Sequence, residues 1–522
     1  MIECRGLSVL INGGDVLRNV DLRLAPGTIT GLVGESGSGK SMTALAIMGL
    51  LPQGARSGGQ VLLDGQDLLT TPETDLCAIR GRRIGMIFQE PMTALNPLMT
   101  IGDQVAEVLR IHHRMARGPA LGRARERLDR VGLPAPRFPL TLYPHELSGG
   151  QRQRVAIALA IAERPDLLIA DEPTTALDVT TQAQILDLLT GLVRDEGMAL
   201  LLITHDLALV AGIADRVAVM KSGRIVEEGA TETLFRTQAH PYTRQLFAAS
   251  RHAPARQKPQ GIPSMLRIEN ATREYRLPHA TGALRAVDDV SLTIGRGESV
   301  GLVGESGCGK STLTRAILGL DPLQRGRILL DGQQVMAGRA MPRELRARMQ
   351  VVFQDPFGSF DPRWQVENLV AEPFHLTTRP PDWRSRVGAA LEEVGLTAPD
   401  AHKYIHEFSG GQRQRIAIAR ALIIRPDLIV LDEAVSALDV RVRAQVLDLL
   451  AGLRGSHGLS YLFISHDLSV VRGICDRVLV MDKGRIVEDG PADQVIGAPR
   501  HLTTQRLVAA MPRFPAKWVP SG

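Results

Sequence analysis

The chain has 522 residues, 44% of them hydrophobic, which is enough apolar material for two or more globular domains. Its 61 basic residues outnumber 56 acidic ones, for a formal net charge of +5, without a long basic block. The composition therefore does not indicate a nucleic-acid-binding protein. We expect neither a zinc site nor a disulfide framework, because metal-ligand spacing is lacking among Cys4, Cys77, Cys308 and Cys475.

The first motif along the chain is GESGSGKS, which fits the phosphate-loop pattern G-x-x-x-x-G-K-[ST]. A short buried strand is predicted before it over residues 28–33, and apolar residues at helical spacing predict a helix after it. The glycines let backbone N–H groups close around phosphate oxygens, the lysine reaches the β- and γ-phosphates, and the serine coordinates Mg²⁺. The phosphate-binding residues predicted here are Gly34, Glu35, Ser36, Gly37, Ser38, Gly39, Lys40 and Ser41.

Two further motifs carry chemistry. Ser148–Gln151 precedes a helix that we expect to begin near Arg152, and the same segment in the second half precedes one expected near Arg413. The amide groups of such a helix start suit a phosphate. The apolar run Leu167–Ala170 is typical of a central parallel strand, which delivers the next two acids to the strand end where ligands bind. The first of these, Asp171, is placed to support Mg²⁺, and the second, Glu172, to polarise an attacking water.

Other segments of the first half carry no predicted catalytic or binding role. The most apolar window, residues 198–220, is interrupted by four polar residues and fails as a membrane span. The N-terminus also lacks the layout of a secretory signal, so we expect a protein that is soluble by itself. A solvated helix face is the preferred interpretation of the cluster Arg123, Arg125, Arg127 and Arg130.

The phosphate loop, the Ser-Gly-Gly-Gln segment and the acidic strand end recur in the second half, where GESGCGKS replaces GESGSGKS. In both halves 23 residues separate the motif serine from the strand-end aspartate, and 34 separate that aspartate from a histidine, His205 or His466. The identical spacing favours a γ-phosphate contact for the histidines and indicates a duplicated domain. The predicted domains are residues 1–251 and 264–522, joined by a Pro-rich linker over 252–263. The second set of site residues is Gly304, Glu305, Ser306, Gly307, Cys308, Gly309, Lys310, Ser311, Ser409, Gly410, Gly411, Gln412, Asp432 and Glu433.

The two loops differ at one position, Ser38 in the first and Cys308 in the second. Backbone N–H groups and a helix N-terminus gather there, and we expect them to lower the pKa of the thiol and favour the thiolate. The alternative is that cysteine is simply a small residue that the loop tolerates.

Together the motifs make both halves resemble ATP-binding-cassette (ABC) nucleotide-binding domains, over nearly the whole chain. The resemblance implies an α/β fold of two tandem P-loop (RecA-like) domains, each with an antiparallel β subdomain and a helical subdomain. It implies an ATP hydrolase using ATP and Mg²⁺, whose halves pair head to tail within one chain, so that each ATP lies between one phosphate loop and the other half's Ser-Gly-Gly-Gln signature.

The resemblance also assigns roles to residues of this sequence. The catalytic residues would be Glu172, Glu433, His205 and His466. The nucleotide would further contact Tyr275, Asp178, Asp439 and the signature residues Ser148, Gly149, Gly150 and Gln151, beside their counterparts in the second half. The metal-binding residues would be Ser41, Gln89, Asp171, Ser311, Gln354 and Asp432.

Three stretches narrow the resemblance to oligopeptide, dipeptide and nickel importer ATPases: FQEPMTALNP from Phe88, FQDPFGSFDP from Phe353 and HPYTRQL from His240. This implies peptide import, with nickel, metal-chelate or other small-solute import as the alternative. The implied partners are two transmembrane permease subunits and, indirectly, an extracytoplasmic solute-binding protein. The chain would be peripheral, on the cytoplasmic face of the inner membrane.

Other twin-cassette ATPases remain as distant alternatives. A translation-associated relative would have a long charged helical linker, and a DNA-repair relative would have cysteine-rich zinc insertions; the sequence has neither. A fused sugar importer ATPase commonly loses one catalytic carboxylate, whereas Glu172 and Glu433 are both present.

Overall fold

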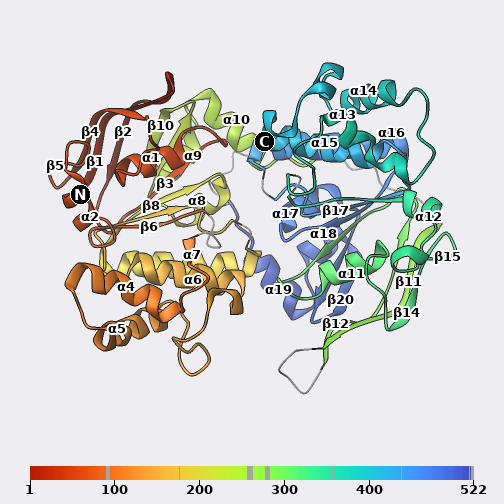
Figure 1. Cartoon of the computed structure of the whole chain (residues 1–522), viewed down its shortest axis with the longest axis horizontal. Coiled ribbons are helices and arrows are strands. Elements are labelled where there is room, and N and C mark those ends of the chain that lie inside the picture. The colour runs from red at the N-terminus through yellow and green to blue at the C-terminus, as the bar shows by residue number, and fades with distance from the viewer. Residues whose placement is uncertain are drawn as a thin grey trace. The chain divides into compact units, whose positions relative to one another are not determined.

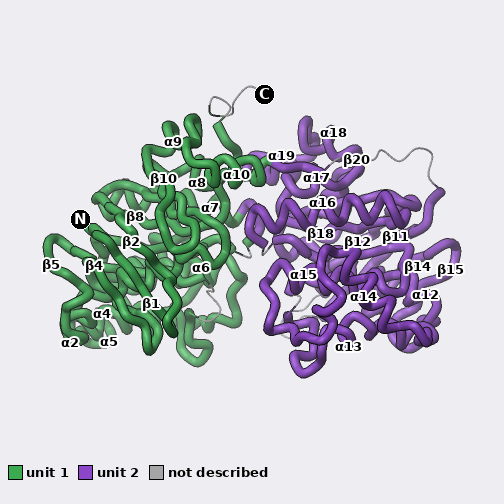
Figure 2. The backbone as a smooth tube through the Cα atoms, turned by 90° about the horizontal axis from the view of Figure 1, so that it is seen from above, with its two compact units in different colours: residues 1–177, 181–251, 512–522 green, residues 178–180, 252–511 purple. Residues whose placement is uncertain are grey.

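The structure is a computed structural model that describes residues 1–89, 94–175, 177–254, 263–276, 283–355, 357–436, 438–515 and 518. The chain divides into two compact units, coloured separately in Figure 2. Unit 1 comprises Met1–Leu177, Thr181–Arg251 and Pro512–Gly522, and unit 2 comprises Asp178–Thr180 and His252–Met511. Most of the predicted linker, residues 255–262, lies outside the described residues.

Each unit contains a four-stranded antiparallel sheet and a six-stranded, mostly parallel sheet (Figure 1). In unit 1 the antiparallel sheet has the order β2 (Gly14–Leu24), β1 (Ile2–Ile11), β4 (Arg56–Leu63) and β5 (Gln66–Asp67). The larger sheet has the order β10 (Arg224–Ala230), β9 (Arg216–Lys221), β3 (Ile29–Val33), β8 (Ala199–Thr204), β7 (Leu167–Asp171) and β6 (Ile84–Ile87). Only β10 runs antiparallel in it, at one edge.

The two faces of this larger sheet bury different layers, because successive residues of a strand point to opposite sides. Leu167 and Ile169 of β7 pack with the antiparallel sheet and the first two helices, whereas Leu168 and Ala170 pack with the later helices. The helices of the first half are α1 (Lys40–Ile47), α2 (Glu73–Ile79), α4 (Ile101–His113), α5 (Arg117–Arg130), α6 (Gly149–Ala160), α7 (Val179–Glu196), α8 (Leu207–Ile213), α9 (Thr231–Thr237) and α10 (Pro241–Ser250).

Unit 2 repeats this architecture. Its antiparallel sheet has the order β12 (Ala283–Gly295), β11 (Ser264–Arg276), β14 (Arg325–Leu330) and β15 (Gln333–Gln334). Its larger sheet has the order β16 (Met349–Val352), β17 (Leu428–Asp432), β18 (Ser460–Ile464), β13 (Ser299–Val303), β19 (Arg477–Asp482) and β20 (Arg485–Pro491). Its helices are α11 (Lys310–Ile317), α12 (Arg343–Ala347), α13 (Val366–Ala371), α14 (Trp383–Glu393), α15 (Gly410–Leu422), α16 (Val440–His457), α17 (Leu468–Ile474), α18 (Ala492–Gly497) and α19 (Leu502–Ala509).

The predicted fold class is therefore confirmed: two repeated α/β halves, each with an antiparallel-sheet layer and a helical layer. The helices after the signatures begin at Gly149 and Gly410, earlier than the predicted starts near Arg152 and Arg413. The reason is a capping box, in which each signature serine caps the helix and the glutamine side chain bonds back.

The arginine cluster is not simply a solvated face. Arg125 donates hydrogen bonds to the carbonyl oxygens of Leu133 and Phe138, and Arg127 donates one to Ala162. These two guanidinium groups hold the loops after α5 and α6 by satisfying carbonyl groups that would otherwise lack partners. Among the described residues, no helix combines the length and apolar character that a membrane span requires.

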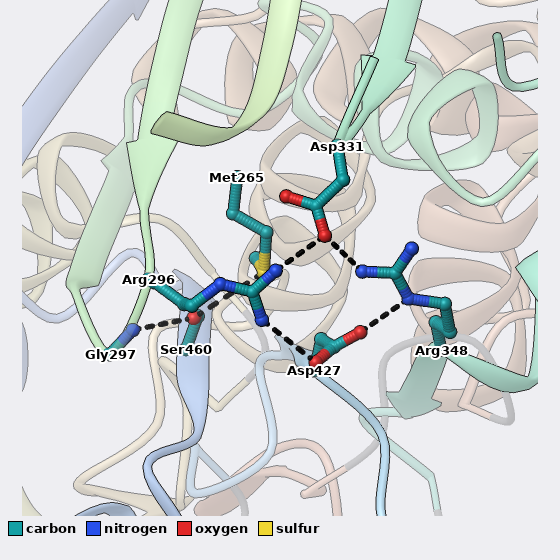
Figure 3. Close-up of polar contacts among 7 residues, drawn as sticks. All are labelled: Met265, Arg296, Gly297, Asp331, Arg348, Asp427 and Ser460. Atoms are coloured by element: carbon teal, nitrogen blue, oxygen red, sulfur yellow. Dashed lines mark hydrogen bonds and ion pairs between the residues drawn. The ribbon is translucent and has the colours of Figure 1, made fainter. Parts of the chain in front are cut away.

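A charged network joins the antiparallel sheet of unit 2 to the larger sheet (Figure 3). Arg296, in the turn after β12, donates to Asp331 at 2.5 Å and to Asp427 at 3.1 Å. Arg348 donates to the same two carboxylates. Asp331 follows β14, while Arg348 and Asp427 directly precede β16 and β17, so the network lies at the N-terminal ends of the parallel strands.

Candidate ATP sites

The first phosphate loop connects β3 to α1. Lys40 is 6% exposed, and its Nζ donates hydrogen bonds to the carbonyl oxygens of Gly34 at 2.9 Å and Glu35 at 2.8 Å. Gly39 caps the helix with φ 105°, a left-handed conformation that favours glycine. The loop therefore ends at a helix N-terminus whose N–H groups suit an anion.

The second loop has the same geometry between β13 and α11. Lys310 Nζ donates to Gly304 at 2.7 Å and to Glu305 at 3.0 Å. Gly309 has φ 112°, and a Cβ there would lie 1.9 Å from the carbonyl oxygen of Ala286. A glycine is thus required sterically as well as conformationally.

A buried carboxylate stands beside the first loop. Asp171 is 5% exposed at the end of β7, and its Oδ1 has no hydrogen-bond partner among the described residues. Burial raises the pKa of Asp171 above its usual range, although a hydrogen bond from Ser41 and the charge of Lys40 act in the opposite direction. A buried, unpaired carboxylate oxygen next to a hydroxyl fits a hard cation such as Mg²⁺.

Glu172 follows directly and pairs with His205. Its Oε1 lies 3.2 Å from His205 Nδ1, and its Oε2 accepts hydrogen bonds from Thr175 Oγ1 at 2.9 Å and from Gln89 Nε2 at 3.2 Å. Burial raises the pKa of Glu172, but His205, Thr175 and the charge of Lys40 outweigh it and hold the pKa at about 2. The group is therefore a carboxylate at neutral pH, as a residue that orients water must be.

The second site has the same glutamate–histidine pair, but the hydroxyl residue beside it makes a different hydrogen bond. Glu433 Oε1 lies 3.3 Å from His466 Nδ1, and despite its burial the pKa of Glu433 is lowered by His466 and Lys310. Burial lowers the pKa of His466, but Glu433 and the neighbouring Asp467 raise it above the usual value. Ser436, at the position of Thr175, donates to the Glu433 carbonyl oxygen at 2.9 Å.

The second glycine of each signature has a packing role beside the predicted one. A Cβ on Gly150 would lie 2.4 Å from Thr181 Cγ2, and one on Gly411 would lie 2.2 Å from Val442 Cγ1. The second glycine of each signature thus permits close packing of its helix on the first turn of the following one. Ser148 Oγ and Ser409 Oγ each accept a hydrogen bond from the backbone N–H of the signature glutamine at 3.4 Å.

Other predicted residues have contacts of their own. Gln89, predicted as a metal ligand, follows β6 and donates a hydrogen bond to Glu172. Tyr275 lies on β11, where its hydroxyl donates to Asp321 at 3.3 Å and Arg273 lies 4.8 Å from its ring centroid. Asp439 caps α16 by accepting from Val442 N–H at 3.0 Å.

The expected thiolate at Cys308 is wrong. Burial raises the pKa of Cys308, although Lys310 Nζ, 3.8 Å from its Sγ, acts in the opposite direction. The thiol is 6% exposed and packs in the core of the antiparallel-sheet layer, so desolvation of the charged form outweighs the nearby cation. Cys308 is therefore a small packed residue, which was the alternative interpretation.

Two contacts of the first site were missed. Thr175 supports Glu172, and the hydroxyl of Tyr242 in α10 accepts a hydrogen bond from the Glu35 N–H at 3.3 Å. Tyr242 belongs to HPYTRQL, one of the segments that carry the family resemblance. The corresponding segment of the second half is HLTTQRL, which has threonine in place of the tyrosine. This difference was the sequence signal that the helix contacts its phosphate loop differently in the two halves.

Two stretches of the chain, residues 17–175 and 287–436, match the family described as ABC transporter. Residues 226–273 match the family described as oligopeptide/dipeptide transporter, C-terminal region. The chain therefore belongs to the ABC transporter family. It is an ATP-binding protein and an ATP hydrolase of that family, in agreement with the paired loops and carboxylates described above.

Relatives of the chain align with it over nearly its whole length. The peptidoglycan transport ATP-binding protein YejF of Agrobacterium fabrum is 48% identical over 527 residues, covering 98% of this chain and 96% of that protein. The glutathione import ATP-binding protein GsiA is 45% identical in Shigella dysenteriae and 44% identical in Escherichia coli, over 95% of this chain and 86% of those proteins.

Proposed function

We propose that this chain is the ATP-hydrolysing subunit of an importer for peptides. The observation that carries the proposal is that each half holds a complete set of groups: a loop lysine, a strand-end aspartate, and a glutamate ionised beside a histidine. The peptide class is supported by the match of residues 226–273 to the oligopeptide/dipeptide region and by relatives named for peptidoglycan and for glutathione, a tripeptide.

The chemistry follows from the side chains. Backbone N–H groups of the loops and the two lysines bind the phosphates, and Ser41 with Asp171, or Ser311 with Asp432, would hold Mg²⁺, which supplies charge neutralisation on the phosphates. Glu172 and Glu433 orient the attacking water, while His205 and His466 hold these carboxylates and contact the γ-phosphate. The sites are completed head to tail by the signatures Ser148–Gln151 and Ser409–Gln412 and by Asp178 and Asp439, with Tyr275 stacking on one adenine.

The permeases dock on the helical layers, at the cytoplasmic face of the membrane. Each unit offers a cavity on its helical layer, and the cavity of unit 2 is lined by Phe353, the residue before Gln354. In unit 1 a cavity of about 340 Å³ lies between α4, the residues before it and Tyr143, with Leu98 86% exposed at its rim. In unit 2 a cavity of about 300 Å³ is lined by Gln350, Val351, Phe353, Ser359, Glu372, Pro373, His375, Leu376 and Arg420.

Reconstitution in liposomes tests the function. The chain, two permeases encoded beside it and their solute-binding protein should take up labelled di- or oligopeptide when ATP is supplied on the side of this chain. Liposomes with this chain alone should take up nothing. Uptake of a nickel chelate but of no peptide would contradict the peptide assignment, and uptake by this chain alone would contradict the role of an importer subunit.

A further inference from the structure

The segment after α19 returns to unit 1. Pro512–Pro515 and Trp518, here named the C-terminal segment, follow directly on unit 2 in sequence but belong to the compact unit 1. Phe514 lies 4.6 Å from Phe247 and 5.9 Å from Phe235, and Trp518 stacks on Phe235 at 6.2 Å, measured between ring centroids. Both side chains pack against the hydrophobic core of unit 1, so the contact excludes water from an aromatic surface.

This aromatic surface is formed by the two helices that end the first half. Phe235 of α9 is fully buried and Phe247 of α10 is 4% exposed. The same helix α10 carries Tyr242, which is 2% exposed and faces the phosphate loop. Residues 242 and 247 are five positions apart on a helix of two to three turns, so a shift of Phe247 moves Tyr242 with it.

Tyr242 touches the loop at the residue that also holds the lysine. Its hydroxyl accepts from the Glu35 N–H at 3.3 Å, while the Glu35 carbonyl oxygen accepts from Lys40 Nζ at 2.8 Å. Lys221 Nζ lies 4.7 Å from the Tyr242 ring centroid, at the end of β9, and positions the ring. The Tyr242 hydroxyl therefore holds the N–H side of Glu35, while Lys40 holds its carbonyl side.

Unit 2 lacks this arrangement among its described residues. Its helices α18 and α19 are built alike, because His501 caps α19 through Thr503 N–H just as His240 caps α10 through Tyr242 N–H. At the position of Tyr242, however, Thr503 donates to Asp482 at 3.1 Å. The positions of Phe235 and Phe247 hold Ile496 and Val508. The aromatic side chains that pack against Phe514 and Trp518 are thus present in unit 1 and replaced by aliphatic ones in unit 2.

We propose that the C-terminal segment is an intramolecular strap that, by covering Phe235 and Phe247, keeps Tyr242 against the first phosphate loop and raises the nucleotide affinity of that site. Tyr242 acts here as a positioning residue, because its effect on the nucleotide passes through the loop backbone that it contacts. The proposal rests on the assignment of Gly34–Ser41 as an ATP-binding loop. Nucleotide binding in the parent protein and its loss on Lys40→Ala test that assignment separately.

The first measurement is binding of a fluorescent N-methylanthraniloyl ATP to the full chain in a Lys310→Ala background, which leaves the first site to be observed. Tyr242→Phe keeps the ring and removes only the hydroxyl, and it should weaken binding about three- to tenfold, the range of one hydrogen bond. Phe514→Ala with Trp518→Ala should weaken binding by a similar factor. Combining all three substitutions should weaken binding little further, because each change breaks the same link from the C-terminal segment through Tyr242 to the phosphate loop.

Matched variants separate positioning from general damage. Thr503→Val removes the corresponding hydroxyl of unit 2 and should leave first-site affinity at the parent value. Phe514→Leu with Trp518→Phe keeps the apolar volume and should restore most of the affinity lost in the double alanine variant. Parent-like binding in the double alanine variant, or effects of Tyr242→Phe and the alanine pair that simply multiply, would overturn the proposal.

Docking itself is measured with Trp518 as the only tryptophan, after Trp364→Phe and Trp383→Phe. Its fluorescence should be shielded from acrylamide, and the shielding should not change on dilution. Phe247→Ala should remove it. Quenching as fast as that of a free tryptophan, or shielding that disappears on dilution, would show that the segment does not dock within its own chain.

Discussion

At the scale of single residues, the two glutamates proposed to orient water have an unusual backbone. Glu172 has φ 48° and Glu433 has φ 50°, in the left-handed region that residues other than glycine rarely adopt. Their N–H groups donate to the carbonyl oxygens of Ile203 and Ile464, each at 2.9 Å. The neighbouring strand thus fixes a costly conformation that brings each carboxylate to its histidine, as is common at functional sites.

Replacing both glutamates should separate binding from hydrolysis. Glu172→Gln with Glu433→Gln keeps the shape but loses the carboxylates, so the variant should bind ATP with parent affinity while phosphate release falls by about 100-fold or more. Phosphate release and nucleotide binding are measured on the same samples. The matched control, Glu126→Gln with Glu344→Gln, changes two exposed glutamates and should be unaltered. Normal phosphate release from the site variant would reject the assigned role.

The charge of His466 depends on Glu433. Burial lowers the pKa of His466, but the effect of Glu433 and Asp467 is larger. The pKa of His466 is therefore raised. A raised pKa means that charged His466 stabilises the fold below its unfolded pKa of about 6.5, and that this contribution is lost as pH rises through the folded pKa. Glu433→Gln should therefore lower the midpoint of the His466 ring titration, followed by NMR and assigned with His466→Gln. An unchanged midpoint would show that the pair is not coupled.

At the scale of elements, the charged network of Figure 3 should matter for stability and not for nucleotide binding. Asp427→Asn leaves Asp331 alone between two guanidinium groups, and should cost about 1 kcal/mol and lower the melting temperature by about 2–4 °C. ATP affinity should not change, because the network lies at the strand ends opposite the site. Asp166→Asn in unit 1 is the control with a smaller expected effect, since Asp166 is 55% exposed against 29% for Asp427. A variant that loses ATP affinity at unchanged melting temperature would contradict this separation.

The elements that the sequence predicted best are those whose pattern has a single physical meaning. The runs Leu167–Ala170 and Leu428–Leu431 are apolar throughout, and both form fully buried central strands ending in the expected aspartates. The starts of the signature helices were misplaced because the two glycines after each serine have low helix propensity, although the S-x-x-Q pattern is itself that of a capping box. The left-handed backbone of Glu172 and the hydrogen bond of Tyr242 to Glu35 depend on strands and helices distant in sequence, which periodicity does not report.

At the scale of the whole molecule, the proposed head-to-tail pairing predicts that the two sites are coupled. Lys40→Ala or Lys310→Ala removes a cation proposed to bind phosphate and should cut turnover at the altered site by about 100-fold or more. Because each site would use residues of both halves, steady-state hydrolysis by the whole chain should fall well below half of the parent rate in either variant. Hydrolysis that stays at half in each variant would show independent sites.

The route of the chain through unit 1 also has a consequence for its synthesis. The aromatic surface of α9 and α10 leaves the ribosome on the order of 250 residues before Phe514. At about 5–20 residues per second, this leaves Phe235 and Phe247 without their final covering for roughly 10–50 s. A nascent chain whose translation stops before Phe514 would never cover them. Its exposed aromatic surface would then be available to chaperones and proteases.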